Sequence, residues 1–310
     1  RFAVEHRDAV GEPDLQVQCG GGADAVGLLA DDSEPREPLV AAAAAHERKD
    51  ETSALASLGT AFALGREHGF QHVPAWRTSA VGDLCVLALR AGVEPEFART
   101  LARTHALVPR TLPFRVKEWP WPFRIQTLGR FDLQRSGAPV EASAKGPGRP
   151  LELLKVLIAL GGQSLRADQL ADALWPHAEA DYAHKSFTAT LHRLRRLLGM
   201  EEALLLRDGR LSMNRSLLWV DTWALEQTLA ELDETLRAPA PASLDVAAKL
   251  MDEVFALYRG PFLPDESEQP AYIAYREQLR ARLLRCLVRV ARVWEDAGRV
   301  TYNRVGFRRV

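Results

Sequence analysis

The chain has 310 residues, a formal net charge of −1 at pH 7 and 47% hydrophobic residues. This composition excludes a disordered chain, and three cysteines are too few for a disulfide scaffold. The length predicts two or three domains. Because the net charge is near zero, attraction of the whole molecule to nucleic acid or membrane is excluded, so an electrostatic partner has to be bound by a local patch.

Cysteine spacing and the absence of long apolar runs predict a soluble, cytoplasmic protein. Cys19, Cys85 and Cys286 lie far apart without C-x-x-C pairing, as is typical of reduced intracellular thiols. No apolar run approaches the ~20 residues of a membrane helix, so we expect no membrane partner. The N-terminus lacks the order of a signal peptide, and the missing initial methionine is typical of a fragment.

The N-terminal third divides into a weakly patterned part and a helical part. Residues 1–50 favour loop or disorder, apart from an alanine run at 41–45 that predicts the opening of a helix. Residues 51–110 carry apolar residues at helical spacing, such as Leu58 and Phe62, and predict paired helices of a repeat-like kind. The proline-rich residues 111–123 predict an extended linker at a domain boundary.

Residues 124–218 have the pattern of a small mixed domain. Alternation around a Ser136-Gly137 turn predicts short strands, and three helical segments follow: "PLELLKVLIALGG", "RADQLADALWP" and "KSFTATLHRLRRLLG". The segment "LLLRDGRLSMN" predicts a β-hairpin with Asp208-Gly209 at its turn. Helix, helix, basic helix and hairpin is the order of a winged helix-turn-helix, whose third helix enters the major groove of DNA.

The third helix, residues 185–198, is predicted to be amphipathic with a cationic exposed side. Phe187, Leu191, Leu194 and Leu198 form its apolar stripe. The exposed side carries Lys185, Ser186, Thr188, His192, Arg193 and Arg196, and Arg207 and Arg210 flank the hairpin turn, where a wing could reach the DNA backbone. Such side chains bind phosphates and guanine edges. Taken alone, the helix is also compatible with an ordinary solvated face, and only the order of elements favours DNA.

Residues 219–310 are predicted to be helical, ending in a long helix from about Pro270 to Gly298. The arginines of that helix are expected to pair with acids of a neighbouring helix, for which the candidates are Asp245, Asp252 and Glu253.

Two further groups of residues have competing interpretations. Tryptophans at 119, 121, 175, 219 and 223 are compatible with a stacking platform for single-stranded nucleic acid, but core or interdomain packing is favoured. His177, Glu179, Asp181 and His184 cluster before the third helix without the spacing of a known metal site, so they are assigned to an exposed loop. No phosphate-binding loop or nucleophile motif occurs, and we expect no enzyme activity, no metal and no cofactor.

The motifs of residues 125–214 resemble the winged helix of OmpR/PhoB-type response regulators. "VDTWALEQ" and "LYRGPFLPD" resemble the bacterial transcriptional activator domain that follows it in SARP-like regulators. "LALRAGVEPEFARTLARTHALVP" is similar to the join with helical repeats in large MalT-like regulators, of which this chain would be a C-terminal part. Arg166 departs from the pattern as a poor helix cap, and the ATPase motif of the large regulators is missing.

This resemblance implies a winged helix-turn-helix DNA-binding domain at 124–218, flanked by TPR-like helical domains in a mainly α chain with little β structure. It implies an activator domain at 219–310, incomplete at its tail, and DNA contacts by the exposed side chains of the third helix and of the hairpin turn named above. The implied partners are double-stranded DNA, bound by a homodimer, and RNA polymerase, touched through Glu179, Asp181 and Tyr182. We therefore expect a sequence-specific transcriptional activator. The alternative is a protein–protein scaffold that retains the winged helix without DNA binding.

Overall fold

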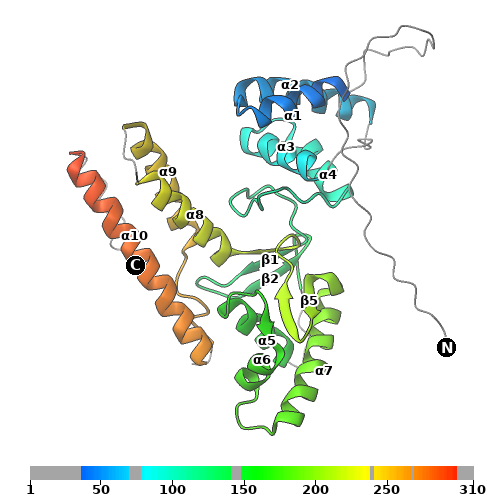
Figure 1. The fold of residues 1–310 in the computed structure, drawn as a ribbon, viewed down its shortest axis with the longest axis vertical. Helices are drawn as coiled ribbons and strands as arrows, with labels where there is room; N and C mark the ends of the chain where they lie inside the picture. Colours follow the sequence, from blue (N-terminus) through cyan, green and yellow to red (C-terminus); the bar gives the residue numbers. More distant parts are fainter. Residues whose placement is uncertain (1–35, 70–77, 141–147, 238–240, 267–268, 299–310) are drawn as a thin grey trace, which may run out of the picture. The chain divides into compact units, whose positions relative to one another are not determined.

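The computed structural model describes residues 36–69, 78–140, 148–237, 241–266 and 269–298, which belong to one compact unit of the chain (Figure 1). The predicted fold class is confirmed, because the described part is mainly helical with two small sheets. None of its helices is long and apolar enough to cross a membrane.

The first four helices are α1 (Arg36–Glu47), α2 (Glu51–His68), α3 (Thr78–Ala91) and α4 (Pro95–Thr104). The alanine run at 41–45 lies inside α1 and does not open it, so that prediction was wrong by five residues. The carboxylate of Asp50 accepts a hydrogen bond from the backbone N–H of Ser53 and caps α2. Residues 1–35, which include most of the weakly patterned segment, lie outside the described residues.

The interior of α2–α4 consists of the predicted apolar positions. Leu58 and Phe62 of α2 are buried, and the Phe62 ring packs edge-to-face against Phe97 of α4 at a centroid distance of 5.3 Å. Gly65 leaves room for Phe97, since a Cβ at this position would lie 2.5 Å from the ring. Close packing of α2 and α4 therefore depends on that glycine.

Two buried thiols predict low chemical reactivity. Burial raises the pKa of both Cys85 and Cys286 to about 12, so the reactive thiolate is roughly a thousandfold scarcer at pH 8 than for an ordinary cysteine. We expect both to resist iodoacetamide in the folded protein and to react in urea, as followed by mass spectrometry of their peptides. Rapid labelling of either one without denaturant would contradict this burial.

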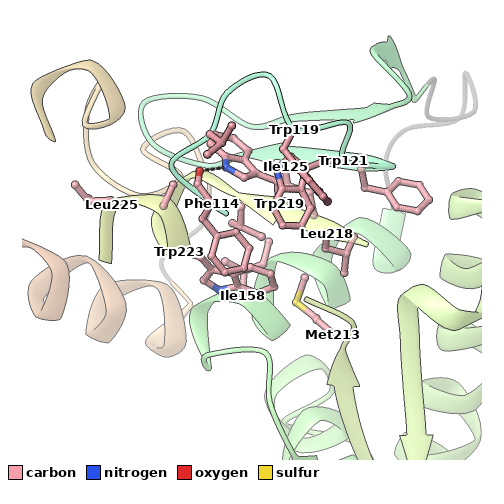
Figure 2. Close-up of a cluster of buried hydrophobic side chains, with 14 of the residues drawn as sticks. Phe114, Trp119, Trp121, Ile125, Ile158, Met213, Leu218, Trp219, Trp223 and Leu225 are labelled. Atoms are coloured by element: carbon pink, nitrogen blue, oxygen red, sulfur yellow. Dashed lines mark hydrogen bonds between the residues drawn. The ribbon is translucent and has the colours of Figure 1, made fainter. Parts of the chain in front are cut away.

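Residues 111–123, predicted as an extended linker, are packed into the protein. Trp119 and Trp121 are each 4% exposed, and the Trp121 ring stacks on Phe114 at 5.2 Å. The indole N–H of Trp219 donates a hydrogen bond to the Phe114 carbonyl at 2.7 Å (Figure 2). The segment is therefore part of the core, because its aromatic residues find partners that are distant in sequence.

A four-stranded sheet has the order β3-β2-β1-β7, with the bounds β1 (Phe123–Gln126), β2 (Asp132–Arg135), β3 (Ala138–Pro139) and β7 (Leu218–Val220). The predicted turn at Ser136-Gly137 is confirmed, and both residues have positive φ. Strand β7 pairs parallel to β1 and was not predicted. Its pairing joins the end of the predicted winged-helix region to the start of this region.

The winged-helix elements follow in the predicted order. They are α5 (Gly148–Ala159), β4 (Leu165–Arg166), α6 (Ala167–Leu174), α7 (Ala180–Leu198), a short 3-10 helix (Glu201–Ala203), β5 (Leu204–Arg207) and β6 (Arg210–Met213). The second sheet has the order β4-β6-β5. Arg166 precedes α6 at the N-cap position and makes no side-chain capping bond, as expected for an arginine. Helix α7 begins five residues earlier than predicted, at Ala180 in place of Lys185.

A buried carboxylate connects the four-stranded sheet to the C-terminal helices α8 (Asp221–Thr235), α9 (Pro241–Leu257) and α10 (Pro270–Asp296). Asp221 is 4% exposed and accepts hydrogen bonds from the backbone N–H groups of Thr127, Leu128 and Thr222 and from the Thr127 hydroxyl. Burial raises the pKa of Asp221, whereas these hydrogen bonds oppose that rise. The end of β1 and the start of α8 are thereby held together.

One arginine of α10 pairs with an acid of a neighbouring helix, and this acid is not among the three predicted candidates. Arg289 pairs with Asp233 of α8 at 3.5 Å. Glu253 of α9 instead accepts hydrogen bonds from Arg115, with a shortest N–O distance of 2.9 Å. The sequence does not reveal this partner of Glu253, because Arg115 lies in a segment whose prolines predict an extended linker.

Candidate nucleic-acid interface

Helix α7 is anchored by one apolar side, which leaves the opposite side facing solvent. The anchoring residues are all buried: Ala183, Phe187, Thr190, Leu191, Leu194 and Leu198. Helix α7 packs on α5 and α6 and stands beside the hairpin β5–β6 (Figure 1). This packing explains why the sequence folds here as an amphipathic helix.

The residues predicted to contact DNA form a continuous outer surface of α7. Of these, Ser186 is half-buried and the others are exposed: Lys185, Thr188, His192, Arg193 and Arg196. The Thr188 hydroxyl donates to the His184 carbonyl at 3.0 Å. Its proton is therefore used within the helix, and Thr188 presents its methyl group and an oxygen lone pair outward. We call this surface of α7 the outer face.

The basic side chains of the outer face are not neutralised by the described part of the chain. Lys185, Arg193 and Arg196 make no ion pair or side-chain hydrogen bond with any residue that the structure describes. Arg166 of β4 contrasts with them, since its hydrogen bond to Asp168 at 2.5 Å lowers the pKa of that carboxyl. The outer face thus retains positive charge for an anionic partner.

Arg195 has a different role from the arginines beside it. Its guanidinium donates two hydrogen bonds, at 2.8 and 3.2 Å, to the carbonyl of Leu204 in β5. The side chain is half-buried. Arg195 therefore joins α7 to the hairpin.

The hairpin β5–β6 closes through the predicted Asp208-Gly209 turn, in which both residues have positive φ. Arg207 and Arg210 face each other across the strands and are exposed. Arg210 donates to the carbonyl of Ser164 at 2.9 Å, whereas Arg207 has no partner among the residues that the structure describes. Arg207 is the less constrained of the two cations at the turn.

The predicted loop before α7 is shorter than expected. Asp181, Tyr182 and His184 lie in the first turns of α7, and only residues 175–179 connect it to α6. Tyr182 is 64% exposed. Asp181 and Tyr182 extend the outer face by one turn, which the sequence did not reveal because no side-chain cap marks the start of the helix. No group of three or more metal-ligating residues occurs in the described ranges.

The tryptophans provide core packing, not an exposed stacking platform. Trp223 is 3% exposed, and it lies with Trp219, Leu218 and Met213 in one buried cluster (Figure 2). Trp175 is half-buried, with the Arg149 guanidinium over its ring at 5.7 Å. The favoured interpretation of these residues is confirmed.

Comparisons with known proteins give a partial structural likeness. No protein-family model matches the chain, and no curated protein matches it. Among solved structures, the chain is similar to Mycobacterium tuberculosis EmbR in complex with a low affinity phosphopeptide, with 20% identity and a TM-score of 0.43. The match covers 57% of this chain and 47% of that one, so this chain spans about half the length of that structure. A likeness of this extent supports no functional inference.

Proposed function

We propose that this chain is a sequence-specific transcriptional regulator that binds double-stranded DNA. Helix α7 enters the major groove, and the hairpin β5–β6 is the wing that reaches the sugar-phosphate backbone. The protein acts as an activator, as a homodimer on DNA, and contacts RNA polymerase. The domain at 124–218 carries the DNA contacts, and the helical regions at 51–110 and 219–310 carry the protein contacts.

One observation carries this proposal. The outer face of α7 holds Lys185, Arg193 and Arg196 without acidic partners in the part of the chain that the structure describes, on a helix fixed by a buried opposite side. A stripe of this kind combines cations for phosphates with groups that recognise base edges. Arg207 lies on strand β5 of the same hairpin, and the first residue of that strand, Leu204, accepts hydrogen bonds from Arg195 of α7.

The test is selection of duplex DNA from a random pool by the purified chain at physiological salt. We expect one enriched motif, present as direct repeats if the protein binds as a homodimer. The double variant Arg193→Ala/Arg196→Ala is expected to lose about 1–3 kcal/mol for each base contact removed, and with it the motif.

The matched control is Arg285→Ala/Arg292→Ala, which removes the same charge from two exposed positions of α10. This variant should retain the motif. Equal losses in both double variants would indicate diffuse basic adhesion. A folded wild-type protein that enriches nothing would favour the protein–protein scaffold.

A further inference from the structure

The early start of α7 places a carboxylate on the outer face. Asp181 lies in the first turn of α7 and is exposed. It is four residues before Lys185, seven before Thr188 and eleven before His192, so all four side chains lie on one strip of the helix. Asp181 makes no ion pair or side-chain hydrogen bond with the described residues.

We propose that Asp181 is a specificity-determining residue that accepts a hydrogen bond from the exocyclic amino group of a base, in first place cytosine. The inference rests on the proposed function, because it assigns one residue of the same interface. It adds an acidic residue, one turn outside the predicted basic segment, to the surface that contacts base edges.

The chemistry of the groove explains why a carboxylate discriminates there. An ionised carboxylate only accepts hydrogen bonds. In the major groove, cytosine presents an amino donor and no acceptor, adenine presents an amino donor beside the acceptor N7, and guanine O6 and N7 and thymine O4 are acceptors. Asp181 is therefore repelled by phosphates and by base edges that present acceptors. At cytosine, the hydrogen bond from the amino group offsets this repulsion. Lys185, one turn away, supplies the complementary donor for a guanine.

The location favours a base contact over a surface for RNA polymerase. Residues near the N-terminus of a recognition helix are those that reach base edges. Asp181 shares its strip with Lys185, whereas the exposed Tyr182 is rotated by about 100° around the helix. An acid in a first turn also stabilises the helix electrostatically. That effect changes folding stability and leaves base preference unaltered, so the two roles are separable by measurement.

The experiment compares selected motifs of the full chain and Asp181→Asn. Asparagine is neutral and pairs with adenine. We therefore expect one position of the motif to change from a preference for cytosine to a preference for adenine, with the preference for cytosine falling about tenfold. Affinity for random duplex should rise, because a negative charge is removed. Thermal unfolding confirms that the variant is folded.

The matched control is Asp172→Asn, which removes the same charge from an exposed position of α6. It should leave every position of the motif unchanged. An unaltered motif in Asp181→Asn would overturn the inference, as would normal DNA binding combined with lost transcription in a reconstituted assay, which would assign Asp181 to polymerase. If the wild-type protein selects no motif, the proposed function fails and the inference fails with it.

Discussion

Binding of duplex DNA is expected to weaken steeply as salt increases. Five basic residues are available on α7 and the hairpin: Lys185, Arg193, Arg196, Arg207 and Arg210. If each displaces one counterion, the log–log slope is about −4.5, and a rise from ~50 to ~200 mM salt weakens binding roughly 500-fold. Fluorescence anisotropy of a labelled duplex over a salt series measures this slope.

A single substitution in the wing tests the same salt dependence more sharply. Arg207→Ala should reduce the magnitude of the slope by about 0.9, because one phosphate contact is lost. The control Arg90→Ala changes an exposed arginine of α3 and should leave the slope unaltered. A wild-type slope near zero would contradict binding through phosphates and favour the scaffold alternative.

Replacement of Asp221 by alanine is expected to destabilise the protein by about 3–5 kcal/mol. The substitution removes the acceptor of four hydrogen bonds of 2.6–2.9 Å from Thr127, Leu128 and Thr222. These buried donors would be left without a partner, and each unsatisfied group costs about 1–3 kcal/mol. Urea unfolding followed by tryptophan fluorescence measures the change.

The same measurement on two other variants separates hydrogen bonding from charge. Asp221→Asn retains the shape and one oxygen but turns an amide N–H₂ group towards the donors, so a smaller loss of stability is expected. Asp172→Asn removes an exposed carboxylate and should alter the free energy of unfolding by less than about 0.5 kcal/mol. A loss below about 1 kcal/mol in Asp221→Ala would show that water replaces the carboxylate.

The elements with strong local signals were predictable from the sequence. The hairpin turn at Asp208-Gly209 requires positive φ, which these residues adopt readily, and the structure has it there. The apolar stripe from Phe187 to Leu198 likewise identified the buried side of α7. In these cases the residues that determine the conformation are neighbours in the chain.

Features set by distant partners were missed. Strand β7 has three residues and exists because it pairs with β1, almost a hundred residues earlier in the chain. Trp121 stacks on Phe114, whose carbonyl accepts a hydrogen bond from Trp219, and no local pattern connects Trp219 to this segment. The start of α7 was misplaced for another reason, since Glu179 precedes it without a side-chain capping bond and polar residues continue into the helix.

The bond between Arg195 and the Leu204 carbonyl also limits what the interface can accommodate. Since these hydrogen bonds hold α7 and the first strand of the hairpin together, the distance between the two elements is fixed at this point. A partner that contacts both elements must have its binding groups at that same spacing. New binding preferences are then expected to evolve by substitution of exposed side chains on α7 and the hairpin, while the distance between the two elements stays constant.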